Sequence, residues 1–226
     1  EHLRRCLVLF CTLQFSLAQE DPVVSTIYGD IRGNARETAA GAAYEEFKGV
    51  PFASPPEDEL RWQKPVVPEA WDGVKDTQSF GRQCIQTGQL FASENCLFLN
   101  VYIPGSAKEL VSQKANLPVL FFVHGGAFLF GSANGYDGAL LATRGNLIVV
   151  TSNYRLSTIG FFSSMTDAAP GNYGLWDQIA ALEWIRDNIA AFWGDPSSVT
   201  IMGQSAGSAS VSHLALSPAA KGLFNR

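Results

Sequence analysis

The chain has 226 residues and a net charge of −5, with 46% apolar and 16% charged residues. This composition supports a packed core and excludes an intrinsically disordered chain. The acidic balance, without a run of Lys and Arg, argues against nucleic acid as a partner, and no apolar stretch is long enough to predict a membrane-spanning helix.

The first residues have the pattern of a targeting segment. Arg4 and Arg5 precede a mostly apolar stretch over residues 6–17, and Ser16 and Ala18 are small residues at the two positions that a signal peptidase reads. We predict a signal peptide over residues 1–18 and therefore a secreted, extracellular protein. A buried N-terminal helix is the alternative.

Two of the four cysteines, Cys84 and Cys96, lie outside the predicted signal peptide. In an oxidising compartment these two have one pairing available to them, a disulfide that closes a short loop. Two free, buried thiols are the alternative.

Apolar runs and helical spacing alternate along the chain. Strands are predicted at 23–28 and 43–50 near a sheet edge, at 97–103, and at 119–123, 147–151 and 199–202, the last three buried on both faces. Helices are predicted at 175–191, ended by the Gly-Asp-Pro sequence at 194–196, and from Ala206 onward. The alternation predicts an α/β fold, a mostly parallel twisted sheet with helices on both faces.

The sequence Gly203-Gln204-Ser205-Ala206-Gly207 lies between the last predicted strand and the last predicted helix. Glycines two residues before and after a serine permit a sharp strand-to-helix turn, which raises the serine hydroxyl above the sheet. The N-terminus of the helix favours negative charge there. The pattern is weak alone, but its place between a strand and a helix makes Ser205 the candidate catalytic nucleophile.

Two adjacent glycines, Gly125 and Gly126, follow His124 at the end of the strand predicted at 119–123. Glycines leave the backbone N–H groups unscreened, and with the N–H of Ala206 they could bind the oxyanion of an acyl-transfer intermediate. A plain Gly-Gly turn is the alternative. The order of this loop and the serine turn along the chain favours the oxyanion hole.

A serine nucleophile needs a histidine base oriented by a carboxylate. His2 belongs to the predicted signal peptide, and His124 begins the glycine loop, where we expect it to fix the loop. His213 lies eight residues after Ser205, a helical rise of about 12 Å that is too long for a hydrogen bond. Since serine, acid and histidine follow one another in such folds, we expect the acid and the base beyond Arg226, in a longer enzyme whose N-terminal part alone is inactive.

Six ordered motifs resemble the type-B carboxylesterases, a family of the α/β-hydrolase fold that includes the cholinesterases. The motifs are the opening motif at 47–62, the cysteine signature at 93–102, the glycine loop at 124–128, Asn-Tyr-Arg at 153–155, residues 171–178, and the serine turn at 203–207. The resemblance covers almost all of residues 19–226, which we interpret as the N-terminal part of such a hydrolase domain.

The resemblance implies roles for individual residues. It implies Ser205 as the nucleophile, with Gly125, Gly126 and Ala206 as oxyanion donors. It also implies a disulfide between Cys84 and Cys96 and an ion pair between Arg61 and Glu94. It implies a small-molecule ester as substrate, and we expect neither a metal site nor a cofactor.

Four features depart from the family pattern. Gln204 stands where most members have Glu, which should lower the basicity of the neighbouring histidine. Trp193 and Ser208 replace glycines, and the loop between Cys84 and Cys96 has no Trp to bind choline by a cation–π contact.

We therefore predict a serine hydrolase that forms an acyl-enzyme with uncharged carboxylic esters. A catalytically inactive, cholinesterase-like adhesion protein is the alternative.

Overall fold

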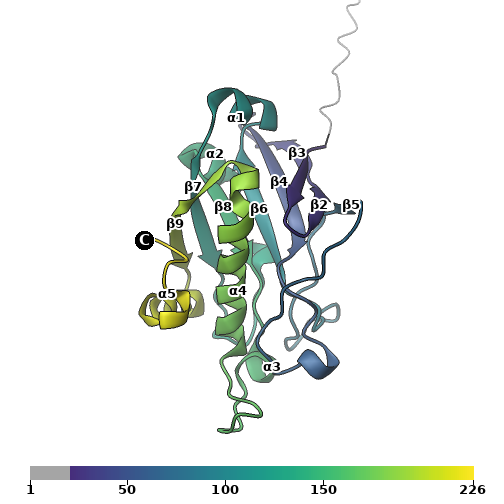
Figure 1. Ribbon diagram of the computed structural model, residues 1–226, viewed down its shortest axis with the longest axis vertical. Coiled ribbons are helices and arrows are strands. Elements are labelled where there is room, and N and C mark those ends of the chain that lie inside the picture. The colour runs from purple at the N-terminus through teal and green to yellow at the C-terminus, as the bar shows by residue number, and fades with distance from the viewer. Residues whose placement is uncertain (1–20) are drawn as a thin grey trace, which may run out of the picture.

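The computed structural model describes residues 21–226 (Figure 1), and the predicted signal peptide lies outside the described residues. The described chain forms two sheets. The smaller contains β1 (Val23–Thr26), β2 (Gly29–Arg32) and β5 (Val74–Asp76), in that order. The larger has the order β3 (Asn34–Glu37), β4 (Ala43–Pro51), β6 (Phe98–Pro104), β8 (Ile148–Ser152), β7 (Leu117–Val123) and β9 (Gly194–Gly203).

Helices cover both faces of the larger sheet, as predicted. The described helices are α1 (Ala107–Gln113), α2 (Ala139–Gly145), α3 (Ser157–Phe161), α4 (Tyr173–Asn188) and α5 (Ala206–Leu216), of which α2, α4 and α5 pack against strands of this sheet. On one face, Ala139 and Ala142 of α2 pack against Tyr102 and Val149. On the opposite face lie α4 and α5, with α4 running along the sheet (Figure 1). The expected α/β architecture is therefore present.

The larger sheet is mixed rather than mostly parallel within the described residues. The pairings β3–β4, β4–β6 and β6–β8 are antiparallel, whereas β7–β8 and β7–β9 are parallel. Parallel pairing begins where the connections become helical crossovers, α2 between β7 and β8 and α4 between β8 and β9. The strand order reverses direction at β7, and such a reversal opens a crevice at the carboxyl ends of the strands.

The prediction of strands buried on both faces is correct for β8 and wrong for β7 and β9. Every residue of β8 is buried. In β7 the alternate residues Leu120 and Phe122 are only partly buried, and Met202 of β9 is 47% exposed. Because α2 packs over β4, β6 and β8, Leu120, Phe122 and Met202 instead line a cavity of about 150 Å³.

The predicted end of the long helix also needs correction. α4 ends at Asn188, and a 3-10 turn over Ile189–Phe192 follows it. Trp193 then adopts a left-handed conformation with φ 61°. The family resemblance implies a glycine at this position, and glycine adopts that conformation without steric cost. The Gly-Asp-Pro sequence does not stop the helix, since its residues already belong to β9.

The last residues return to the outer edge of β9. The N–H of Ile201 donates to the carbonyl of Arg226 at 2.8 Å, and the N–H of Asn225 donates to the carbonyl of Val199 at 2.8 Å. A second bond, 3.3 Å long, runs from the N–H of Arg226 to the same Val199 carbonyl. Arg226 is thus flanked by hydrogen bonds in the pattern of a parallel pairing with β9.

Candidate active site

Ser205 occupies a strained turn between β9 and α5. Its backbone has φ 55° and ψ −119°, a combination that non-glycine residues rarely adopt. The residue is exposed, one position before the start of α5. This is the geometry of a nucleophile elbow, in which strain presents the serine hydroxyl above the carboxyl end of a strand.

The two flanking glycines of the elbow have steric reasons to be glycine. A Cβ on Gly203 would lie 2.2 Å from the carbonyl carbon of Gly207. A Cβ on Gly207 would lie 2.1 Å from the carbonyl oxygen of Val123 at the end of β7. Glycine at both positions therefore lets α5 fold back over β9 and approach β7 closely.

The glycine loop after β7 packs directly against this elbow. A Cβ on Gly125 would lie 2.2 Å from Oε1 of Gln204 and 3.0 Å from Cβ of Ser205. In the part of the chain that the structure describes, the N–H groups of Gly125, Gly126 and Ala206 donate to no other protein group. The structure thus brings together the three donors and the nucleophile that the sequence singled out.

Ala127 is a further candidate donor that sequence reasoning missed. It continues the turn with φ 54°, after φ 115° at Gly126. No acceptor for its N–H is found among the described residues. Alanine rarely adopts a positive φ, so the residue type gave no signal that the free N–H groups extend past the glycines.

His124 fixes the loop and cannot serve as the base. Its Nδ1 lies 2.7 Å from the carbonyl oxygen of Gly125, and because that oxygen only accepts, Nδ1 carries the proton. The ring stacks on Tyr154 at 4.4 Å between centroids, and the Tyr154 hydroxyl donates to the His124 carbonyl at 3.0 Å. Burial lowers the pKa of His124 to about 4, so the ring is neutral near pH 7.

Asn153, directly after β8, is the main support of the segment that follows the glycine loop. Its Oδ1 accepts from the Ser132 hydroxyl at 3.1 Å and from the Ala133 N–H at 2.9 Å. Its Nδ2 donates to the carbonyls of Arg82 and Cys96, both at 3.1 Å. One buried amide thus ties this segment to both ends of the cysteine loop.

Arg155 completes the Asn-Tyr-Arg motif with a buried ion pair. Its Nη2 donates to Oδ1 of Asp177 at 2.7 Å and its Nε donates to Oδ2 at 2.9 Å. The two side chains are 1% and 0% exposed. Burial raises the pKa of Asp177, and the guanidinium opposes that shift. The pair joins the segment after β8 to α4.

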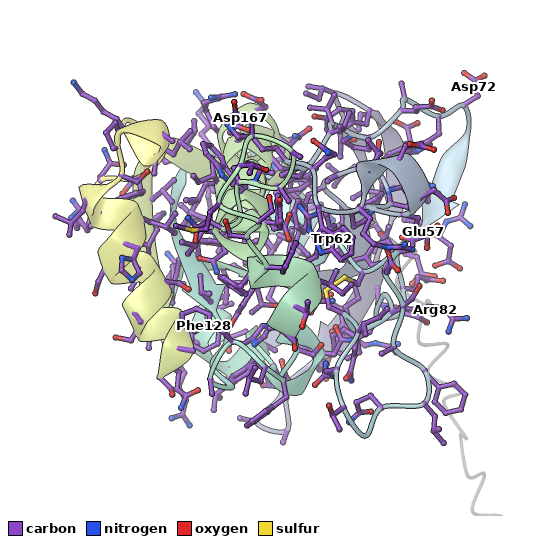
Figure 2. The ribbon with its side chains drawn as sticks, turned by 90° about the horizontal axis from the view of Figure 1, so that it is seen from below. Glu57, Trp62, Asp72, Arg82, Phe128 and Asp167 are labelled. Atoms are coloured by element: carbon purple, nitrogen blue, oxygen red, sulfur yellow. A yellow bond between two sulfur atoms is a disulfide. The ribbon has the colours of Figure 1, made fainter. Side chains whose placement is uncertain are left out.

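The two pairings implied by the family resemblance are present. Cys84 and Cys96 form a disulfide, which appears as the yellow bond in Figure 2. Nε of Arg61 donates to Oε2 of Glu94 at 2.7 Å. The side chains of Arg61 and Glu94 are 37% and 14% exposed, so this ion pair is partly exposed at one end of the cysteine loop.

His213 lies away from Ser205, the candidate nucleophile. It lines an open cavity of about 440 Å³ with Phe128 of the glycine loop, Phe161 of α3 and Leu175 of α4. Figure 2 labels Phe128 in this region, at the end of the molecule where α3 and α5 lie in Figure 1. No hydrogen bond joins Ser205 to either of the two histidines in residues 21–226.

Within residues 21–226 no group of three or more His, Cys, Asp or Glu side chains is placed to hold a metal ion. None of the described helices combines the length and apolar character needed to cross a bilayer.

Gln204 is exposed, and its Oε1 accepts from the Tyr136 hydroxyl at 3.3 Å.

A sequence model described as "Carboxylesterase family" matches residues 20–226. The chain belongs to the carboxylesterase family. A duck (Anas platyrhynchos) fatty acyl-CoA hydrolase precursor, medium chain, is 45% identical over 92% of this chain and 40% of its own length. The para-nitrobenzyl esterase of Bacillus subtilis is 42% identical over 90% of this chain and 42% of its own length.

Solved structures of the carboxylesterase family agree with the fold. A PNB esterase structure superposes with a TM-score of 0.82 at 43% identity, covering 92% of this chain and 43% of its own. A Geobacillus stearothermophilus carboxylesterase gives a TM-score of 0.81 at 44% identity, covering 90% of this chain and 42% of its own. The α/β-hydrolase fold is therefore established, and the chain spans about two fifths of the length of these relatives.

Replacing Gly125 by alanine tests the contact between the glycine loop and the elbow. The added Cβ must displace Gln204 and Ser205, so kcat of the complete protein for a p-nitrophenyl ester should fall by about 10²-fold or more. Gly135→Ala is the matched control, because a Cβ there meets nothing within 4 Å. Equal kcat values for the two variants would contradict the placement of Gly125 beside the nucleophile.

Proposed function

We propose that the protein containing this chain hydrolyses uncharged carboxylic esters, with Ser205 as the nucleophile. The observation that carries the proposal is the exposed, strained Ser205 beside a loop whose N–H groups are free. Family relatives with esterase and hydrolase names support ester hydrolysis in general.

In the proposed reaction, Oγ of Ser205 attacks the ester carbonyl carbon while a base takes its proton. The carbonyl oxygen becomes an oxyanion, which the N–H groups of Gly125, Gly126 and Ala206 bind. The C–O bond to the alcohol then breaks, and the alcohol leaves with the proton held by the base. Water attacks the acyl-enzyme in the same way and releases the acid.

Neither histidine in residues 21–226 is placed to act as the base. His124 is buried and neutral, with Nδ1 engaged by the carbonyl of Gly125. His213 lies eight residues from Ser205, about 12 Å along the helix. We propose that the remainder of the complete protein supplies both groups, which makes residues 21–226 inactive on their own.

The preference for uncharged esters rests on the surroundings of the loop. The cavity beside it is lined by the apolar residues Phe128, Leu129, Phe161 and Leu175 and by the polar residues Ser157, Thr158, Asn172 and His213. Because this lining contains no Asp, Glu, Lys or Arg, an ionic acyl or alcohol group would lose hydration there without gaining a charged partner.

We also propose that the protein is secreted, with cleavage after Ala18. The segment over residues 1–18 has the features of a signal peptide. The disulfide between Cys84 and Cys96 supports this proposal, because structural disulfides persist in oxidising compartments.

The test is to express the complete coding sequence and treat culture medium and cell lysate with a fluorophosphonate probe, which phosphonylates activated serines. We expect one labelled species in the medium, beginning at Gln19, with the label on the peptide that contains Ser205. Label on another serine would contradict the proposed nucleophile. Label on Ser205 found in the cells alone would contradict secretion but not catalysis.

A further inference from the structure

Gln86 of the cysteine loop hydrogen-bonds to Gly131, which lies three residues after the glycine loop. Its Nε2 donates to the carbonyl of Gly131 at 2.9 Å, and the N–H of Gly131 donates to its Oε1 at 2.8 Å. We propose that Gln86 is a positioning residue, which holds the oxyanion donors in their working orientation through Gly131. The proposal rests on the proposed function of Ser205 and the glycine loop.

Gly131 lies directly behind the peptide that joins Gly125 to Gly126. A Cβ on Gly131, where φ is 115°, would lie 2.5 Å from the Gly125 carbonyl oxygen and 2.7 Å from Nδ1 of His124. The backbone of Gly131 therefore packs against the hydrogen bond between His124 Nδ1 and the Gly125 carbonyl. A shift of Gly131 would remove this packing contact.

The orientation of the Gly125 carbonyl decides the direction of a candidate oxyanion donor. The carbonyl of Gly125 and the N–H of Gly126 belong to one planar, trans peptide unit and point in opposite directions. Holding the carbonyl against Gly131 and His124 therefore aims the N–H away from them. Tilting this peptide would misdirect the N–H, and oxyanion stabilisation depends on donors set in advance of the reaction.

Gln86 is itself held in place by hydrogen bonds, so it can fix the position of Gly131. Its Nε2 also donates to the carbonyl of Cys84 at 3.1 Å, and both amide hydrogens are thus used. Cys84 is fixed by the disulfide to Cys96, whose carbonyl accepts from Asn153. Among the described residues, Gly131 has no other hydrogen-bond partner for its N–H or its carbonyl.

The experiment compares Gln86→Ala, Gln86→Glu and Gln89→Ala in the complete protein. Gln86→Glu keeps an acceptor for the Gly131 N–H but places a carboxylate oxygen against the Gly131 carbonyl. Gln89 is the matched control, since it is exposed in the same loop and no side-chain hydrogen bond is found for it in the described structure. Rates are expressed per active site titrated with the fluorophosphonate probe.

We expect Gln86→Ala and Gln86→Glu to lower kcat per active site about 10-fold, a part of the 10²–10³-fold cost of losing an oxyanion donor outright. KM should stay within about twofold, as for a group that acts only in the transition state. The inhibition constant of a trifluoromethyl ketone, which forms a tetrahedral adduct with serine, should rise by the same factor as kcat falls. Gln89→Ala should leave all three unchanged.

An unchanged kcat per active site in Gln86→Ala, even with a lower melting temperature or fewer titratable sites, would overturn the proposal by showing a purely structural role. Amide hydrogen exchange over residues 124–131 provides a readout independent of turnover. It should be faster in Gln86→Ala than in Gln89→Ala, and equal rates would also overturn the proposal. If the parent protein has no Ser205-dependent turnover, the proposed function fails, whereas the exchange result still decides whether Gln86 holds the loop.

Discussion

Replacing Ser205 by alanine in the complete protein is expected to lower kcat for p-nitrophenyl acetate by about 10⁴-fold or more, because covalent catalysis is lost as a whole. Alanine has the same backbone restrictions as serine, so the strained turn with φ 55° keeps its conformation at no added cost. The rate is measured by release of p-nitrophenol, together with the melting temperature of the variant.

The matched control for this experiment is Ser208→Ala. Ser208 lies in the first turn of α5 and is exposed; among the described residues its side chain makes no hydrogen bond, and its backbone carbonyl accepts from the Ser212 hydroxyl. We expect its activity to stay within twofold of the parent. Activity retained by Ser205→Ala would reject Ser205 as the nucleophile. Activity absent from the parent itself would favour a binding role for the same fold.

Replacing Arg155 by methionine is expected to have the largest effect on stability, a loss of about 3–5 kcal/mol in the free energy of unfolding. The substitution leaves the carboxylate of Asp177 buried at 0% exposure without its main partner. Denaturant unfolding of the complete protein, followed by tryptophan fluorescence, measures the loss.

Two variants test the cause of that loss. Arg186→Met removes an exposed pair with Asp187 and should cost less than about 1 kcal/mol. The double variant Arg155→Met, Asp177→Leu removes both buried charges and should recover part of the stability lost in Arg155→Met. A double variant no more stable than the single variant would show that packing, not the stranded charge, causes the loss.

The sequence predicted the nucleophile turn and most of the central strands because both depend on local patterns. The glycines on either side of Ser205 mark a turn that larger residues cannot enter, and continuous apolar runs mark β7 and β8. One helix was missed: the capping box between Ser106 and Glu109 starts the short helix α1, which we did not predict.

The supports of the candidate site were not predictable, because they are contacts between distant residues. Gln86 reaches Gly131 across 45 positions, and Asn153 reaches Arg82 across 71. Amide side chains are common in loops, and nothing in their spacing tells which will find a backbone partner. The open face beside β7 was unpredictable for a related reason, since burial depends on where α2 packs rather than on the strand's own residues.

The hydrogen bonds between Arg226 and β9 fix the direction of the chain at Arg226 relative to β9. They place the last residue in parallel register beside Thr200, three residues before Gly203 and five before Ser205. A strand propagated from that register would run in the same sense as β9 and end at the same edge of the sheet as Ser205. Ligand sites of such sheets lie at the carboxyl ends of the strands, so the direction of this contact matches the edge at which Ser205 lies.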